Sequence, residues 1–216
     1  MRKQEISVTV DIVILTIADE QLKVLLVKRG VAPFQGDYAL PGGFVLNDES
    51  LDDAARRELS EETGTRDIYL EQLYSFGDPG RDPRGRVVTV AYYALVPSGR
   101  SPLKAGTDAA EAQWFTVNKL PSLAFDHRQI VDCAIMRIRN KLEYTTVGFE
   151  LLPEKFTLSA LQHMYEIILG RELDKRNFRR KIDALGLVKP LKEMQATGRR
   201  PAQLFRFAKR EKRGQG

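Results

Sequence analysis

The sequence predicts an α+β protein with two domains, a mixed α and β domain of residues 1–148 and a small winged helix-turn-helix domain of residues 149–216. Strand-like apolar runs dominate the first part, whereas two amphipathic helices and a short ribbon make up the last. Residues 151–216 hold 16 of the 34 Lys and Arg but 7 of the 29 Asp and Glu, a net charge of +9, which leaves −4 for residues 1–150. This asymmetry is typical of two domains, one of which meets a polyanion.

Composition excludes several classes of protein. With 216 residues, 43% hydrophobic and 29% charged, the chain has the balance of a globular protein with a sizeable core. The single cysteine, Cys133, excludes an intrachain disulfide and a multi-cysteine zinc site, and it favours a reducing compartment. The N-terminus lacks the apolar region of a signal peptide, and the longest apolar runs are strand-length. We therefore expect a cytoplasmic protein that does not enter a membrane.

The first part of the chain contains most of the predicted strands. Residues 6–17 form a nearly continuous β-branched run, and a polar turn at 18–21 joins it to the run 22–28, which predicts a hairpin. Further strands are expected at 39–45, 68–76, 87–96 and 113–117. The segment 39–45 is interrupted by Pro41-Gly42-Gly43.

Two helices are predicted in this first domain. Residues 51–63 place Leu51, Ala54, Ala55 and Leu59 on one face, after a capping pair Ser50 and Asp53 and before Gly64. Residues 127–143 carry an i, i+4 stripe of Ile130, Ala134, Ile138 and Leu142.

The pattern changes after a connector at 144–155. One helix is expected between Thr157 and Gly170, and a second at 174–185 with Phe178, Ile182 and Leu185 turned inward. A two-stranded ribbon follows, with strands at 187–189 and 203–207 and a turn at 197–201. The charged tail 209–216 is expected to be disordered.

The first predicted helix carries three carboxylates. Glu58, Glu61 and Glu62 stand at i, i+3 and i+4, so they share one face, where their mutual repulsion favours a bound Mg²⁺ or Mn²⁺. Arg57 adjoins the cluster, and the backbone carbonyl of Gly42 is a candidate further ligand. Such a cation suits phosphoanhydride hydrolysis, because it neutralises phosphate charge and activates water. A solvated acidic helix face is the alternative interpretation.

The complete string around these residues is GGFVLNDESLDDAARRELSEETGT. It resembles the Nudix box, from which it departs only at Thr65, where a bulky aliphatic residue is usual. The resemblance implies an α/β/α sandwich in which Glu58, Glu61 and Glu62 hold metal and Glu49 braces the loop. It also implies catalytic roles for Arg57, Glu58 and Glu61, with Glu58 as a candidate general base.

Three arginines outside this box are candidate ligand-binding residues. Arg81 and Arg84 lie in the loop FGDPGRDPRG between two predicted strands, and Arg29 follows another strand. Arginine makes bidentate contacts with phosphate, so these residues suit a diphosphate. The loop is similar to that of Nudix proteins that handle ADP-ribose. A surface loop with self-paired Arg and Asp explains the pattern equally well.

The last predicted helix has a basic face. Its exposed side should carry the candidate DNA-binding residues Lys175, Arg176, Asn177, Arg179 and Arg180, opposite the apolar side. Such a helix would enter the major groove of DNA, with Arg199 and Arg200 at the wing tip near the backbone. A solvated helix in a dimerisation domain is the alternative.

Further strings extend the resemblance over residues 6–208: VTVDIVILTI, FGDPGRDPRGRVVTVAYYAL, FDHRQI, KLEYTTVGFELLPEKFTL and GRELDKRNFRRKI. The whole chain resembles the Nudix-related transcriptional regulators of NAD metabolism, the NrtR family. This implies a homodimer that binds a double-stranded DNA operator and responds to an ADP-ribose-type ligand. Many members have a degenerate box and no hydrolase activity, whereas this box is intact. A dedicated Mg²⁺-dependent ADP-ribose pyrophosphatase with an accessory basic domain is therefore the second hypothesis, and an RNA-end-processing Nudix enzyme the third.

Overall fold

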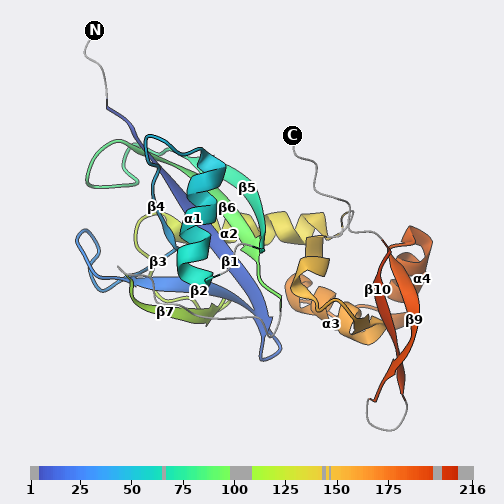
Figure 1. Ribbon diagram of the computed structural model, residues 1–216. Helices are drawn as coiled ribbons and strands as arrows, with labels where there is room; N and C mark the ends of the chain where they lie inside the picture. Colours follow the sequence, from blue (N-terminus) through green and yellow to red (C-terminus); the bar gives the residue numbers. More distant parts are fainter. Residues whose placement is uncertain are drawn as a thin grey trace. The chain divides into compact units, whose positions relative to one another are not determined.

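The computed structural model describes residues 5–64, 67–97, 109–142, 145, 147–196 and 201–208. The chain divides into two compact units, Met1–Arg137 and Ile138–Gly216 (Figure 1). Their division falls within helix α2 (His127–Lys141), and the domain boundary that we place after residue 148 stays a prediction. No helix in the described ranges is long and apolar enough to cross a bilayer.

The first unit is built on a mixed sheet. Its other elements are β1 (Ser7–Ala18), β2 (Gln21–Arg29), β3 (Tyr38–Ala39), β4 (Gly42–Phe44), α1 (Leu51–Thr63), β5 (Tyr69–Phe76), β6 (Val87–Leu95) and β7 (Ala109–Thr116). In the described part of this unit, seven strands form one sheet of order β3-β2-β1-β6-β5, with β4 paired to β1 and β7 paired to β2. Only the β1–β6 pair is parallel among these described ladders, and the predicted β1–β2 hairpin is confirmed.

Helices cover both faces of this sheet, which explains the nearly continuous apolar run of β1. Val10, Ile12 and Ile14 pack with Ala54 and Leu59 of α1 in one buried cluster. The intervening side chains of β1 face the other side of the sheet, where α2 lies (Figure 1). The predicted α/β/α sandwich is therefore confirmed.

The segment predicted as one strand at 39–45 forms two short strands, β3 and β4, on either side of Pro41. Proline has no backbone N–H to donate to a ladder. The carbonyl of Pro41 instead accepts a 2.8 Å hydrogen bond from the amide of Ile12. Strand β4 then pairs with β1, and this pairing brings Gly43 opposite Val10, close to α1.

The second unit is a small helical domain with a ribbon. Besides the end of α2 it contains η1 (Val147–Leu151), β8 (Phe156–Thr157), α3 (Leu158–Leu169), α4 (Lys175–Leu185), β9 (Val188–Gln195) and β10 (Ala202–Phe207). Thr157 and Asp174 cap the starts of α3 and α4, and Gly170 and Gly186 end them in the left-handed conformation. The winged helix-turn-helix fold predicted from the helix–helix–ribbon order is confirmed.

Two details of this unit differ from the prediction. The ribbon is a three-stranded sheet of order β8-β10-β9 within the described residues, because the two residues after the predicted connector form β8. This extra strand places Phe156 against Phe207, whose ring also stacks on Phe149 with centroids 4.0 Å apart. Leu185, which we predict to be inward, is 49% exposed, since α4 ends there.

Candidate functional site

Helix α1 presents the predicted acidic face. Its start is fixed by Ser50, whose hydroxyl accepts the amide hydrogen of Asp53, and its end by Gly64 in the left-handed conformation. Because Ala54, Ala55 and Leu59 are buried against the sheet, the rotation of the helix about its axis is set. The three glutamates lie beside this buried face, so Glu62 is buried and the Glu58 side chain is 12% exposed, whereas the Glu61 side chain is 53% exposed. The helix borders a hollow of about 420 Å³ lined by Asp53, Arg56, Arg57, Ser60 and Glu61.

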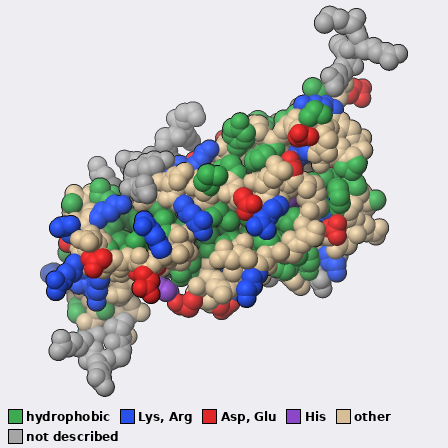
Figure 2. Space-filling model, turned by 180° about the vertical axis from the view of Figure 1, so that it is seen from behind, with side chains coloured by type: hydrophobic (Ala, Val, Ile, Leu, Met, Phe, Trp, Pro, Cys, Tyr) green, Lys and Arg blue, Asp and Glu red, His purple; other side chains and the backbone are tan. Residues whose placement is uncertain are grey.

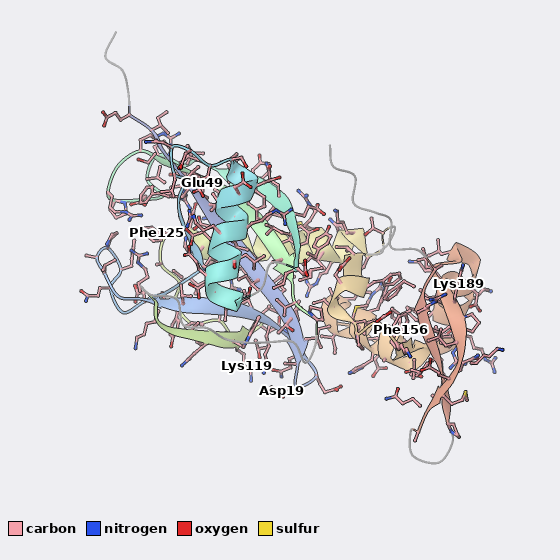
Figure 3. The ribbon with its side chains drawn as sticks, in the orientation of Figure 1. Asp19, Glu49, Lys119, Phe125, Phe156 and Lys189 are labelled. Carbon is pink, nitrogen blue, oxygen red and sulfur yellow. The ribbon has the colours of Figure 1, made fainter. Side chains whose placement is uncertain are left out.

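Arg57 ties this helix to the loop before it. Its guanidinium donates to both carboxylate oxygens of Glu49, at 2.8 and 3.0 Å, and to Oε1 of Glu58 at 2.6 Å. Glu49 in turn accepts the amide hydrogen of Leu46 at 2.9 Å, and Figure 3 shows Glu49 beside the start of α1. These bonds raise the pKa of Arg57 and hold the carboxylate of Glu58 in one orientation.

Two further residues make this site suitable for a divalent cation. Glu62 is 9% exposed, and its Oε2 atom has no hydrogen-bond partner among the described residues. Burial, reinforced by the charges of Glu58 and Glu61, raises the pKa of Glu62 to about 7. Burial also raises the pKa of Glu58, against the opposing effect of Arg57. A cation would supply the missing partner for Glu62 and favour the ionised carboxylates.

Gly43 brings strand β4 close to this carboxylate group. A Cβ atom at this position would lie 2.2 Å from Oε1 of Glu58, so any side chain would displace the carboxylate. Across the described part of the chain, no three His, Cys, Asp or Glu side chains are already grouped to hold a metal ion. Glu61, whose side chain is 53% exposed, would have to turn toward its neighbours. Mg²⁺ needs one or two carboxylates with substrate phosphates and water, so the residues fit the ion.

A buried polar network lies on the opposite face of the sheet. Arg81 donates to both oxygens of Asp126, at 2.7 and 2.9 Å, and to Asp11 at 3.4 Å. His127 accepts the amide hydrogen of Leu40 at Nδ1, 2.8 Å away, and its Nε2 lies 3.6 Å from Asp11. Burial lowers the pKa of His127 and favours the neutral ring. The network therefore joins the Arg81 loop, β1 and the start of α2 into one support.

A stack of aromatic rings and guanidinium groups lies beside this network. The guanidinium of Arg84 is 5.1 Å from the ring centre of Phe44 and 5.5 Å from that of Phe125, and Arg29 is 4.8 Å from Phe125. Phe34 packs edge-on against Phe125, labelled in Figure 3, with centroids 4.8 Å apart. Phe34 and Phe125 have positive φ angles of 63° and 55°, a strained conformation that clusters at functional sites.

The three arginines predicted to bind ligand differ in their exposure and in the partners that their guanidinium groups already have. Arg84 forms a bidentate ion pair with Asp82, as the self-paired interpretation expects. Its side chain nevertheless remains 40% exposed to solvent. Arg29 donates to the carbonyl of Pro33 at 2.8 Å. Arg81 is only 3% exposed, and its guanidinium is taken up by two carboxylates. Direct contact of these three residues with a ligand stays a prediction.

The basic face of α4 has the predicted arrangement. Phe178 and Ile182 are 5% and 1% exposed, and the Phe178 ring packs edge-on against Tyr165 with centroids 5.3 Å apart. The predicted DNA-binding residues Lys175, Arg176, Asn177, Arg179 and Arg180 are all exposed. Figure 2 shows Lys and Arg side chains gathered over the C-terminal unit. Arg199 and Arg200, like Thr65 and the tail, lie outside the described residues.

Comparisons with known proteins match both units. The NUDIX domain family matches residues 7–133, and the NrtR DNA-binding winged helix domain family matches residues 148–207. The ADPR responsive transcriptional repressor NtrR of Acinetobacter baylyi is 41% identical over 204 residues, which cover 93% of this chain and 81% of that repressor. The chain belongs to the NrtR family of Nudix-related regulators. The predicted resemblance is therefore confirmed.

Other relatives of this NrtR family member match either the whole chain or the Nudix domain alone. The crystal structure of Shewanella oneidensis NrtR complexed with a 27mer DNA has 38% sequence identity and a TM-score of 0.83, with 93% of each chain covered. An ADP-ribose pyrophosphatase of Methanocaldococcus jannaschii is 45% identical over 115 residues, which cover 53% of this chain and 67% of that enzyme.

Several residues of the site were not identified from the sequence. Asp11 is a lone carboxylate inside an otherwise apolar strand, and this signal could have revealed a buried ionic partner. The sequence places His127 only at the start of the helix 127–143, whereas its ring nitrogens lie 2.8 Å from the amide of Leu40 and 3.6 Å from Asp11. The sequence pattern gives no comparable signal for Phe34, Phe44 or Phe125, because their stacking depends on the fold.

Proposed function

We propose that this NrtR family member is a transcriptional repressor that binds operator DNA through α4 and ADP-ribose through its Nudix domain. The observation that carries the proposal is the exposed basic face of α4 in a chain that matches an ADPR responsive repressor along 93% of its length. The regulated genes would belong to NAD metabolism, and the protein would act in the cytoplasm. The two parts would be the Nudix domain 1–148 and the DNA-binding domain 149–216.

The charge distribution within α4 supports a polyanionic partner. Lys175 and Arg176 occupy its first turn, which contains no acidic residue. Cations at this end of a helix oppose the macrodipole, so they destabilise the free helix. DNA phosphates at the same place would interact favourably with both the cations and the helix end. The arginines one turn further on, Arg179 and Arg180, would reach base edges or phosphates in the major groove.

Three arginines outside the Nudix box would contribute to the ADP-ribose site. We assign ligand contacts to Arg29 and Arg84, whose guanidinium groups lie over the rings of Phe125 and Phe44 and suit a diphosphate. Arg81 would act through the network, by holding the loop that carries Arg84. On binding, Arg84 would give up some of its hydrogen bonds to Asp82 and donate to the diphosphate instead.

Similarity to the pyrophosphatases of the Nudix family implies a divalent cation, and we propose that it is Mg²⁺ or Mn²⁺. Glu58, Glu61, Glu62 and the carbonyl of Gly42 would hold it. When bound, it would neutralise diphosphate charge and activate water. Arg57 would keep Glu58 in place, and Glu58 or Glu61 would accept a proton during hydrolysis.

A dedicated ADP-ribose pyrophosphatase is the second candidate function. The observation that favours it is the intact acidic face with the unpartnered Glu62 oxygen. Glu62→Gln should reduce Mg²⁺- or Mn²⁺-dependent ADP-ribose hydrolysis by orders of magnitude while the fold is retained. Absence of metal-dependent hydrolysis by the wild type would leave the site as a sensor.

The repressor function is tested on α4. Arg179→Ala and Arg180→Ala should abolish specific DNA binding, measured by gel shift with genomic fragments, and leave ADP-ribose binding unchanged. Arg128→Ala, which alters an exposed arginine of the first unit, is the control. Wild-type DNA binding by both α4 variants would refute the role of this helix.

We also propose that the DNA-binding form is a homodimer. Two copies of α4 about 34–36 Å apart would read half-sites separated by one helical turn. Sedimentation with and without DNA tests this proposal, and a monomer under both conditions would refute it.

A further inference from the structure

Two basic side chains face each other at the base of the ribbon, away from its tip. In the ladder between β9 and β10, Lys189 lies directly opposite Arg206. Both side chains are exposed, and Figure 3 shows Lys189 close to α4. Directly opposed residues of an antiparallel pair have Cβ atoms only about 5 Å apart, and like charges in this position destabilise the sheet.

No carboxylate in the described part of the chain forms an ion pair with either residue. A compensated lysine lies nearby, since Lys155, just before β8, pairs with Glu193 of β9 at 2.7 Å. Strand alternation explains the isolation of Lys189 and Arg206. Phe207 turns toward the core, where it stacks on Phe149 and Phe156, so its neighbour Arg206 points to the outer face.

An anion between these two side chains would reverse the sign of their interaction. Arginine offers a planar set of donors that matches phosphate, and lysine adds a compact positive charge. We propose that Lys189 and Arg206 form a second phosphate-binding site for duplex DNA, separate from the base-reading face of α4 and from the wing tip. This inference rests on the proposed DNA-binding function.

The position of the pair favours DNA over a free phosphate. Lys189 follows the end of α4 by four residues, and the amide of Ala208 donates to the carbonyl of Leu187 at 2.9 Å, which closes the base of the ribbon two residues after the helix ends. A duplex held by α4 would therefore meet this pair within the same compact unit. Contact with the backbone would set the orientation of the duplex without reading its sequence.

Salt dependence of DNA binding tests the proposal. Arg206→Gln and Lys189→Gln should each weaken binding of a random-sequence duplex several-fold in fluorescence anisotropy. Each should also reduce the slope of log K against log salt by about 0.9, the value for one lost phosphate contact. Lys155→Gln removes the same charge from the same unit but from a residue, next to β8, that is already paired with Glu193. This control should leave the slope unchanged.

Reversal of the charge at position 206 gives a second, independent measurement, the Tm of the variant. Arg206→Glu replaces a like-charge pair by an opposite-charge pair, so it should raise the Tm while it weakens DNA binding further. A structural role for Arg206 predicts the reverse, a lower Tm.

The possible outcomes separate this inference from the proposed function. Unchanged slopes for both Gln variants, with normal wild-type binding, would overturn the second site alone. Reduced ADP-ribose affinity with unchanged DNA binding would also overturn it, because the anion would then be a free nucleotide. Failure of the wild type to bind any duplex would instead refute the DNA-binding function.

Discussion

Removal of the buried guanidinium of Arg81 should destabilise the Nudix unit. Arg81 is held by Asp126 and Asp11, and all three side chains are largely buried, with exposed fractions of 3%, 12% and 9%. The substitution Arg81→Met keeps most of the aliphatic length but leaves two carboxylates close together without a cation. Charges left unpaired in the interior cost far more than exposed ones.

The expected loss in the free energy of unfolding is about 4 kcal/mol, the middle of the range for breaking a buried ion pair. For a unit of this size, such a loss lowers the Tm by about 10 °C. The single tryptophan of the chain, Trp114, lies in β7 of this unit. Thermal unfolding followed by its fluorescence therefore reports the first unit separately from the winged helix unit.

The matched control is Arg128→Met. Arg128 pairs with Asp132 at 3.1 Å, but both side chains are more than half exposed, so this change should cost less than about 1 kcal/mol. Adding Asp126→Asn to Arg81→Met should recover part of the stability, because it removes one of the two unpaired charges. Equal Tm values for the two Met variants would refute the role of the network.

Three further predictions concern other parts of the chain. Phe178→Ala should destabilise the winged helix unit by about 3–5 kcal/mol, seen as an earlier loss of circular dichroism and of DNA binding, and a wild-type melting curve would refute the packing of α4. The hydrogen bonds from Arg84 lower the pKa of Asp82, so their stabilisation is present above about pH 4 and is lost as pH falls through the lower, folded pKa. Urea titrations of Arg84→Gln should therefore show a shallower fall in stability in acid than the wild type, and parallel curves would contradict this. Gly43→Ala should displace the carboxylate of Glu58 and weaken Mn²⁺ binding in calorimetry, whereas unchanged affinity would show that the close approach does not matter.

Local patterns predicted most of the fold because each has a local cause. Apolar spacing and a capping pair are sufficient to place α1, and the Gly64 and Gly186 ends follow from left-handed backbone conformations. Strand β8 could not be predicted in this way. It consists of only two residues, Phe156 and Thr157, and it exists because β10 pairs with it across a long sequence separation.

The same limit applies to the candidate site. The carboxylates of α1 are close in sequence, so their shared face follows from helical spacing alone. The partners of Arg81 are 45 and 70 residues away. The pairing of β1 with β6 brings Asp11 toward the Arg81 loop, and the hydrogen bond from the amide of Ala124 to the carbonyl of Tyr38 ties the segment of Asp126 to the sheet. Likewise, Leu185 is at an inward position of the helical pattern but is exposed, because the helix ends before anything covers it.

The proposed function requires that ADP-ribose binding to the Nudix domain changes the affinity of the same chain for DNA. The most direct measurement is the affinity for a fluorescent duplex that the protein selects from a random-sequence library, titrated with and without ADP-ribose. We predict sequence-selective binding whose Kd changes by about 5–150-fold when ADP-ribose is added, with a reciprocal change in ADP-ribose affinity when DNA is present. An identical Kd in both titrations, or no selection of any sequence, would contradict it.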